Sequence, residues 1–370
     1  MLRRLLTPIF VVVEAVFARL ARLLPRRTGD APLIQPYIGY ATRERLRLRG
    51  RVLEEEGIQP ADVSDSWWRN FITMLRRFET DEMADAALEI RFDQQKVWIR
   101  TDAEGYFDVD LPLKTSLSSE QNRYPVEIRL LDDPRKPGIS DPNISVIGEV
   151  IVAAQAAEFG VISDLDDTVL VSDAFSNVRV LLNTFFKNAR TRLPFPGVGA
   201  FYRALQAGTA ATFNPIFYVS SSPWNLYDFI MEFFKVHTIP IGPIFLQDIG
   251  IGPSKLITQP HSAHKRRYID QLLTDFPDLR FILIGDSGQH DPQIYAQVVA
   301  DYPDRIAAIY IRDVRPGERA NELSQLIQQA AAHQVDMLLV EDTLAAAEHA
   351  ANSGFVTAES LAHLRETLTV

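Results

Sequence analysis

Hydrophobic and polar positions follow two different patterns, and the change falls near residue 155. Before that point, short β-like runs are separated by turns, and in the first of them apolar and polar residues alternate. Regular short strands joined by turns predict a small β-sandwich-like domain over residues 43–155. The predicted strands cover residues 46–53, 87–92, 97–101, 107–111, 126–131 and 146–152.

Within this first half, residues 101–107 predict a hairpin turn in which Gly105 supplies a positive φ. Residues 67–78 predict a helix inserted between strands. Residues 28–42 are rich in Pro, Gly and Arg, and they predict a linker ahead of the β-domain.

After residue 156, apolar runs alternate with helical patterns, which is typical of a parallel sheet with βαβ crossovers. The predicted strands are residues 159–163, 216–219, 244–246, 281–284, 306–311 and 337–340. The predicted helices are residues 199–206, 226–235, 264–276, 292–302 and 321–333, with more helix over 344–367. Residues 156–370 therefore read as one α/β domain with a C-terminal extension, and residues 169–211 predict a small helical cap.

Residues 1–27 predict an amphipathic helix, because apolar residues recur at helical spacing in residues 2–24 while charged residues occupy the other side. The uncharged run over residues 5–13 is too short to cross a bilayer. A helix lying in the membrane interface fits this pattern. Two alternatives stay open, a signal peptide cleaved after Ala18 and a helix packed on the protein's own core.

The formal net charge of −10 argues against a general nucleic-acid binder. The charge is uneven, since Arg outnumbers Asp and Glu over residues 1–51, and a basic segment suits an anionic membrane surface. The chain has no cysteine, which excludes disulfides, thiolate catalysis and Cys-ligated zinc. We expect a cytoplasmic protein that can bind the inner face of the membrane peripherally; an exported form is the alternative.

Candidate chemistry begins where an apolar run ends at Asp164. A second carboxylate, Asp166, follows two residues later, and the Thr168 hydroxyl comes two residues after that. Acids at this spacing beyond a strand end can both reach one divalent cation. The first can attack a phosphoryl group, and the second can protonate a leaving oxygen and later activate water. The alternative is a solvated acidic turn after a strand.

Hydroxyl groups follow the next predicted strand, in the segment Ser220-Ser221-Ser222-Pro223-Trp224. Hydroxyls and backbone amides at a helix start can hold a phosphate group, and we assign this role to Ser220 and Ser221. We expect Ser222 to be the N-cap of a helix whose first turn contains Pro223.

A glycine-rich acidic loop follows the strand predicted at residues 281–284. Gly285 and Gly288 are expected to let this loop turn tightly. Mg²⁺ prefers oxygen ligands and usually takes one or two carboxylates together with water and phosphate. The predicted metal site consists of Asp164, the backbone carbonyl of Asp166, Asp286, and Asp291 as the residue that orients a ligand water.

One cation is needed to offset the charges of the nucleophile and the phosphate. Lys265 and Lys255 are the candidates, whereas Arg266 and Arg267 are expected to face solvent. Histidines at positions 261 and 264 have metal-ligand spacing, but we expect them to be surface residues near a helix start.

Taken in order, these motifs resemble the haloacid dehalogenase (HAD) superfamily of aspartate-dependent phosphotransferases. Residues 160–168, 220–224, 264–265 and 285–292 resemble more narrowly the actin-patch-type phosphatidate phosphatases, and the similarity covers about residues 155–315. At the last motif, Gln293 stands where we expect an acidic residue. The resemblance implies an α/β fold with a HAD-like Rossmannoid parallel sheet and a small helical cap, preceded by the β-sandwich-like domain.

The resemblance also implies Mg²⁺-dependent hydrolysis of phosphatidic acid to diacylglycerol. Asp164 would be the nucleophile and Asp166 the general acid and base, while Lys265 would balance charge and Thr168, Ser220 and Ser221 would hold the phosphoryl group. Two other functions stay open: hydrolysis of a soluble phosphomonoester, and lipid binding without turnover.

Overall fold

A computed structural model describes residues 32–54, 83–115, 117, 121–132, 140–153, 156–166, 168–169, 194–247, 261–317 and 319–369. The amphipathic helix predicted at residues 1–27, the helix predicted at 67–78 and much of the cap predicted within 169–211 lie outside these residues. In the part of the chain that the structure describes, no helix is long and apolar enough to cross a membrane.

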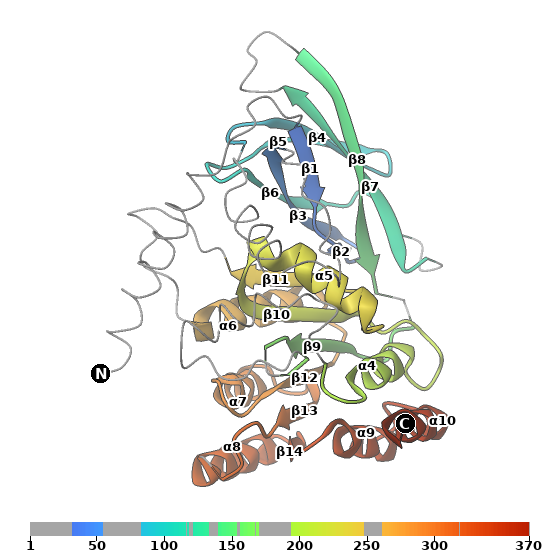
Figure 1. The fold of residues 1–370 in the computed structure, drawn as a ribbon, viewed down its shortest axis with the longest axis vertical. Coiled ribbons are helices and arrows are strands. Elements are labelled where there is room, and N and C mark those ends of the chain that lie inside the picture. Colours follow the sequence, from blue (N-terminus) through green and yellow to red (C-terminus); the bar gives the residue numbers. More distant parts are fainter. Residues whose placement is uncertain are drawn as a thin grey trace, which may run out of the picture.

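The N-terminal half forms an eight-stranded sheet with the order β1-β3-β2-β8-β7-β4-β5, in which β6 pairs with β3 (Figure 1). Its apolar side chains enclose one core that includes Leu46, Leu88 and Ile128. All six strands predicted from the sequence are confirmed. The strands are β1 (Pro32–Pro36), β2 (Gly39–Ala41), β3 (Arg45–Glu54), β4 (Ala87–Phe92), β5 (Gln95–Arg100), β6 (Tyr106–Pro112), β7 (Arg123–Asp132) and β8 (Ser140–Val152).

Two predictions for this half were wrong. The predicted linker contains β1 and β2, because Ile34 packs into the β-domain core and Tyr40 is also buried. The prolines did not prevent a strand, since β1 lies at the edge of the sheet, where prolines are tolerated. Gly105 has the expected positive φ of 73°, but the turn does not close a hairpin, because β6 pairs with β3 instead of β5.

The C-terminal half contains a six-stranded sheet with the order β11-β10-β9-β12-β13-β14, and all of its neighbouring strands are parallel. The α/β prediction and its strands are thereby confirmed. The strands are β9 (Gly160–Asp164), β10 (Ile216–Pro223), β11 (Ile244–Gln247), β12 (Phe281–Asp286), β13 (Ile306–Arg312) and β14 (Met337–Val340). The helices are α4 (Val198–Ala207), the 3₁₀ helix η1 (Trp224–Leu226), α5 (Tyr227–Val236), α6 (His261–Asp275), α7 (Asp291–Asp301), α8 (Ala320–Ala332), α9 (Thr343–Asn352) and α10 (Ala358–Thr369).

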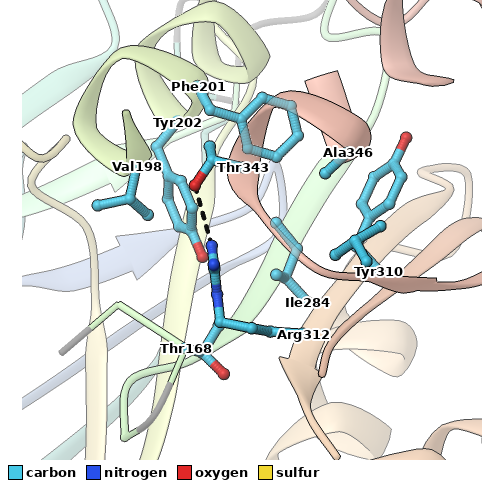
Figure 2. A pocket seen from close by; sticks show the side chains of 10 residues that line it. Thr168, Val198, Phe201, Tyr202, Ile284, Tyr310, Arg312, Thr343 and Ala346 are labelled. Atoms are coloured by element: carbon cyan, nitrogen blue, oxygen red, sulfur yellow. Dashed lines mark hydrogen bonds between the residues drawn. The ribbon is translucent and has the colours of Figure 1, made fainter. Parts of the chain in front are cut away.

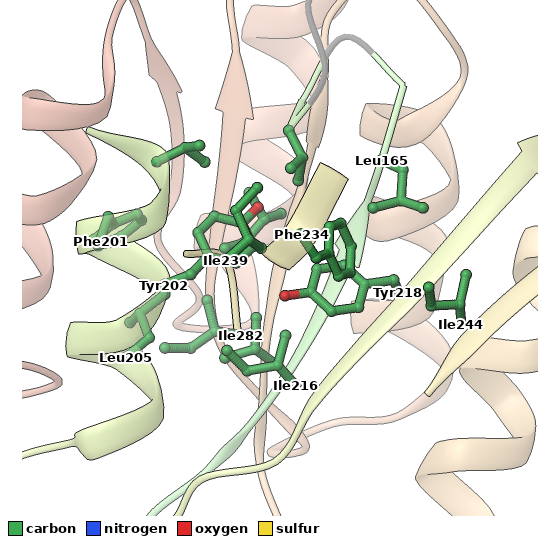
Figure 3. Close-up of a cluster of buried hydrophobic side chains, with 14 of the residues drawn as sticks. Leu165, Phe201, Tyr202, Leu205, Ile216, Tyr218, Phe234, Ile239, Ile244 and Ile282 are labelled. Atoms are coloured by element: carbon green, nitrogen blue, oxygen red, sulfur yellow. The ribbon is translucent and has the colours of Figure 1, made fainter. Parts of the chain in front are cut away.

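Helices cover both faces of this sheet, so both faces are buried. Successive residues of a strand point to opposite faces and therefore join different cores. On β10, Tyr218 joins one core cluster with α4, α5 and α9, whereas Phe217 joins the other with α6 and α7. Figure 3 shows part of the first cluster, where Tyr202 and Leu205 of α4 face the strands of the sheet. Helices on both faces leave the carboxyl ends of the strands as the place for polar side chains.

The two halves share buried contacts. Tyr37 and Tyr106 of the β-domain belong to the first core cluster of the α/β domain, and Tyr40 belongs to the second. A polar contact accompanies them: Asp275 at the end of α6 accepts hydrogen bonds from Arg47 Nε at 2.6 Å and from the Tyr40 hydroxyl at 2.6 Å. The β-domain is therefore packed directly against the parallel sheet and its helices.

Candidate active site

The site lies where the strand order of the parallel sheet reverses. β9 lies between β10 and β12. The chain continues from β9 through β10 to β11 on one side, and from β12 through β13 to β14 on the other. Open α/β sheets bind ligands at such a point, beyond the carboxyl ends of the strands. Asp164 is the last residue of β9 and Asp286 the last of β12, so these two carboxylates lie at this position.

Three buried carboxylates meet there. Asp164, Asp286 and Asp291 each place an oxygen within 4.8 Å of the oxygens of the other two. Asp291 begins α7, and its Oδ2 accepts a hydrogen bond from the Asp286 amide at 3.2 Å. We call these three residues the carboxylate triad.

Gly285 is needed for space. A Cβ atom built at this position would lie 2.3 Å from Asp291 Oδ2, so any side chain would displace this carboxylate. The backbone φ angles of Gly285 and Gly288 are not positive, in contrast to Gly105. The glycines were expected for a tight turn, but what the structure requires at residue 285 is close approach to Asp291.

Lys265 enters the triad from α6, as the sequence predicts. Its Nζ donates a hydrogen bond to Asp164 Oδ1 at 2.9 Å and another to Asp291 Oδ1, and the side chain is buried. Burial lowers the pKa of Lys265, but the charges of Asp164 and Asp291 outweigh it and raise this pKa above the ordinary value. Arg266 and Arg267 stay outside the site, where Arg266 pairs with Asp270 and Asp301. The rival, Lys255, lies outside the described residues.

Charge in the triad is not balanced by Lys265 alone. Burial raises the pKa of Asp164 well above its ordinary value of 3.8, and Lys265 opposes this shift only in part. Three carboxylates face one ammonium, so a divalent cation bound by the carboxylates would balance the remaining negative charge. The donors are all oxygen atoms, which is the set that Mg²⁺ prefers. The residues present therefore fit a magnesium ion.

Asp166 has a separate environment. Its side chain accepts a hydrogen bond from Ser220 Oγ at 2.7 Å and a longer one from Ser222 Oγ at 3.3 Å. The triad identified among the described residues does not include its carboxylate. The side chain of Asp166 therefore faces serine hydroxyl groups, whereas the triad carboxylates face Lys265.

Serine assignments need a correction. Ser222 was expected to be a helix N-cap, but β10 continues to Pro223, and the N-cap of η1 is Pro223 itself. The Ser222 hydroxyl faces Asp166 instead, and its amide donates to Ser220 Oγ at 2.9 Å. Sequence reasoning therefore missed Ser222, because a serine before Pro-Trp has the local pattern of a cap. Ser221, assigned to phosphate, is half-buried between them.

Two further residues discussed from the sequence, Thr168 and His264, are both buried. Thr168 is buried, with Oγ1 3.5 Å from Asp164 Oδ2, so it lies beside the predicted nucleophile. His264 was expected at the surface but is buried, with its ring edge-on to Tyr268 at 5.0 Å between centroids.

A pair of hydroxyl groups that the sequence did not suggest connects β9 to α4. Ser163 Oγ lies 2.7 Å from the Tyr202 hydroxyl, and it also donates to the carbonyl of Asp164 at 2.6 Å. Tyr202 comes from α4, 39 residues further along the chain, so no local pattern could have linked the two residues.

Part of the chain is similar to known proteins. Residues 159–313 match the family model described as the catalytic domain of phosphatidate phosphatase APP1. The chain is 30% identical over 198 residues to phosphatidate phosphatase APP1 of Saccharomyces cerevisiae, an alignment that covers 53% of this chain and 32% of the yeast protein. It is 27% identical over 267 residues to an uncharacterized protein of Schizosaccharomyces pombe, covering 69% of this chain and 41% of the relative.

The aligned region thus spans less than half the length of each relative. Among solved structures, a carbohydrate acetylesterase from Xanthomonas citri aligns with a TM-score of 0.28 and 10% identity, over 81% of this chain and 74% of that chain, which is too low to indicate a shared fold. The match to the phosphatidate phosphatase model is confined to residues 159–313, the segment that contains the carboxylate triad and Lys265.

Proposed function

We propose that the protein is a Mg²⁺-dependent phosphomonoester hydrolase of the HAD type that converts phosphatidic acid to diacylglycerol through an aspartyl-phosphate. The observation that carries this proposal is the buried carboxylate triad with Lys265 at the switch point of a parallel sheet, inside the segment that matches the phosphatidate phosphatase model.

In the first step, a carboxylate oxygen of Asp164 attacks phosphorus as the bond from phosphorus to the leaving oxygen breaks. Asp166 gives its proton to that oxygen, so the alcohol leaves neutral. In the second step, Asp166 takes a proton from water, the water oxygen attacks phosphorus, and the Asp164–phosphorus bond breaks. Inorganic phosphate is released, and both aspartates return to their starting states.

Each residue's environment suits its role. Lys265 holds Asp164 at the end of β9 and carries a positive charge toward the phosphoryl oxygens. Ser220 and Ser222 fix the orientation of Asp166 without placing it in the triad, so its proton can move independently. The triad would hold Mg²⁺ through Asp164, Asp286 and Asp291, and the bound cation would supply positive charge for the phosphoryl oxygens.

The lipid substrate is proposed from the family match, since the yeast relative is named as a phosphatidate phosphatase. The amphipathic pattern of residues 2–24 adds a physical reason, because an interfacial helix would bring the site to its substrate.

The test is phosphate release from phosphatidic acid in mixed micelles, measured beside p-nitrophenyl phosphate, with and without Mg²⁺. Asp164→Asn serves as the blank. Mg²⁺-dependent release that favours the lipid supports the proposal. Release from the soluble ester alone would replace phosphatidic acid by a soluble phosphomonoester. Lipid binding with no release from either substrate would refute hydrolysis and favour a non-catalytic lipid-binding protein.

A further inference from the structure

A small pocket beside the catalytic centre is lined by one buried cation, Arg312, and by Thr168, Tyr202 and Thr343, while the rest of its lining is mainly apolar. Its volume of about 20 Å³ suits one water-sized group. Arg312 is the last residue of β13 and pairs in register with Asp286, so it lies at the same edge of the sheet as the triad. None of the three triad carboxylates belongs to the pocket lining, so this is a site distinct from the triad.

Among the described residues, Arg312 is a buried cation whose hydrogen bond and ring contact are both with neutral groups. It is 9% exposed, its Nη2 donates to Thr343 Oγ1 at 3.0 Å, and its guanidinium lies 4.0 Å from the ring centroid of Phe195. Within the same part of the chain, its Nε is buried and has no hydrogen-bond partner. Figure 2 shows the guanidinium beside Tyr202 and directed toward Thr343. A buried charge with an unsatisfied donor is costly, and a ligand oxygen would offset this cost.

Asp342, whose negative charge acts on Arg312, is already engaged. Asp342 is exposed, and its side chain accepts a hydrogen bond from the amide of Ala345 as the N-cap of α9. It therefore lies outside the pocket lining, and no Asp or Glu belongs to that lining in the described parts of the chain.

One helix N-terminus adds positive potential. The pocket is lined by Val198, the first residue of the ten-residue helix α4, which has no acidic residue in its first turn and no side-chain cap. Helix N-termini attract anions through their partial positive charge and their free amides. Thr343, the first residue of α9, also lines the pocket, but the start of that helix is already capped by the Asp342 carboxylate. Arg312 and the start of α4 therefore make the pocket electropositive from two directions.

We propose that this pocket binds one anionic oxygen of a phosphate group, with Arg312 Nε as its principal donor. The size of the pocket limits the buried part of the ligand to about one oxygen, so the rest of the phosphate lies outside it. The ligand class rests on the proposed function, in which phosphate is both the reacting group and a product. The source is either free phosphate or the phosphate of a lipid headgroup.

The test is calorimetric titration of the full chain with inorganic phosphate in EDTA. Without a divalent cation, Asp164, Asp286 and Asp291 outnumber Lys265 and repel an anion, so binding reports on the Arg312 pocket. Arg312→Met should weaken binding about tenfold or more, which is about 1.4 kcal/mol. Lys265→Met, the control for binding at the catalytic centre, should change the affinity less than about twofold, within the scatter of an indirect effect.

Absence of phosphate binding in EDTA would overturn the proposal, as would equal affinity of Arg312→Met and wild type. If Arg312→Met does not fold, crystals grown with selenate decide: an anomalous peak next to Arg312 supports the pocket, and a peak elsewhere or none refutes it.

Two further experiments distinguish a lipid phosphate from free phosphate, and separate the pocket from the proposed substrate. Soluble dihexanoyl phosphatidate that displaces inorganic phosphate in EDTA identifies the lipid headgroup as a ligand, whereas failure to displace it identifies free phosphate. Phosphate binding that depends on Arg312, in a protein that hydrolyses no phosphatidate with Mg²⁺, keeps the pocket and refutes the proposed substrate.

Discussion

Tyr37 of the β-domain stacks on Trp224 of the α/β domain, with ring centroids 4.4 Å apart and an angle of 14° between the ring planes. Trp224 follows Ser222 by two residues, and Ser222 together with Ser220 holds Asp166. Arg49, which also belongs to the β-domain, places its guanidinium 5.1 Å from the Trp224 ring centroid. The β-domain thus contacts the segment that orients the predicted general acid and base.

Tyr37→Ala should therefore lower kcat as well as stability. Loss of a buried aromatic ring costs about 3–5 kcal/mol, and Trp224 would lose its stacking partner. Hydrolysis of p-nitrophenyl phosphate, measured well below the melting temperature, checks the effect. Tyr37→Phe, which keeps the ring, should retain kcat.

Phe92→Ala is the matched control for Tyr37→Ala. It removes a buried ring from the β-domain core and should cost similar stability, but it should leave kcat unchanged. Equal kcat in Tyr37→Ala and Phe92→Ala would contradict a positioning role for the stack.

Substitution of the serines around Asp166 should have graded effects. The Ser220 bond to Asp166 is 2.7 Å long and the Ser222 bond 3.3 Å, so Ser220→Ala should disturb the proton donor more. We expect kcat to fall about tenfold or more in Ser220→Ala and less in Ser222→Ala, within the range that general acid–base catalysis supplies. Steady-state kinetics of the single variants check this, with Ser221→Ala as the comparison. A larger loss in Ser221→Ala than in Ser220→Ala would contradict this order and favour the phosphate contact that the sequence predicts for Ser221.

Asp164→Asn should abolish turnover and stabilise the metal-free fold. Burial raises the pKa of Asp164 above its ordinary value of 3.8, so this group lowers stability as the pH rises beyond that value. The neutral asparagine avoids this cost, and Asp291 remains as the partner of Lys265. The melting temperature in EDTA at neutral pH should rise by about 2–4 °C for each kcal/mol gained.

Two measurements test the cause of that gain. The advantage of Asp164→Asn should shrink as the pH falls toward 3.8 and vanish below it, where the wild-type carboxyl is protonated in both the folded and the unfolded chain. Mg²⁺ should stabilise the wild type more than the variant. A variant that melts below the wild type in EDTA would show that the carboxylate of Asp164 is stabilising even without a cation.

Asp275→Ala should destabilise the contact between the two halves. It would leave Arg47 and Tyr40 without a buried acceptor, and we expect a loss of about 2–4 kcal/mol in the free energy of unfolding. Asp110 also pairs with Arg47, but its side chain is 48% exposed against 7% for Asp275. Asp110→Ala should therefore cost less than about 1 kcal/mol. Equal losses in denaturant titrations would show that the buried contact contributes no more than the exposed one.

Deletion of residues 1–24 tests the predicted interfacial helix. Association with anionic vesicles should weaken, because the apolar face and the arginines would be lost, while hydrolysis of p-nitrophenyl phosphate should persist. Vesicle association equal to that of the full chain would refute a membrane role for this segment.

The sequence alone predicted the strands of the α/β domain and several of the side chains that meet at the edge of its sheet. Apolar periodicity is a local property, and the strands predicted at residues 281–284 and 306–311 lie inside β12 and β13. Asp164 and Asp286 were predictable as neighbours because the carboxyl ends of parallel strands meet at one edge. Lys265 was chosen from its position in the motif order, and the structure places it in the triad.

Tertiary structure decided which side chains face one another. Asp291 was expected to orient a water, but it joins the triad because Gly285 leaves room for its carboxylate. β1 and β2 formed in a segment with linker composition because Tyr37 and Tyr40 pack into the α/β cores. Arg312 meets the starts of α4 and α9 only after the chain has crossed the sheet several times. These contacts join parts of the chain that are far apart in sequence, so local sequence patterns cannot predict them.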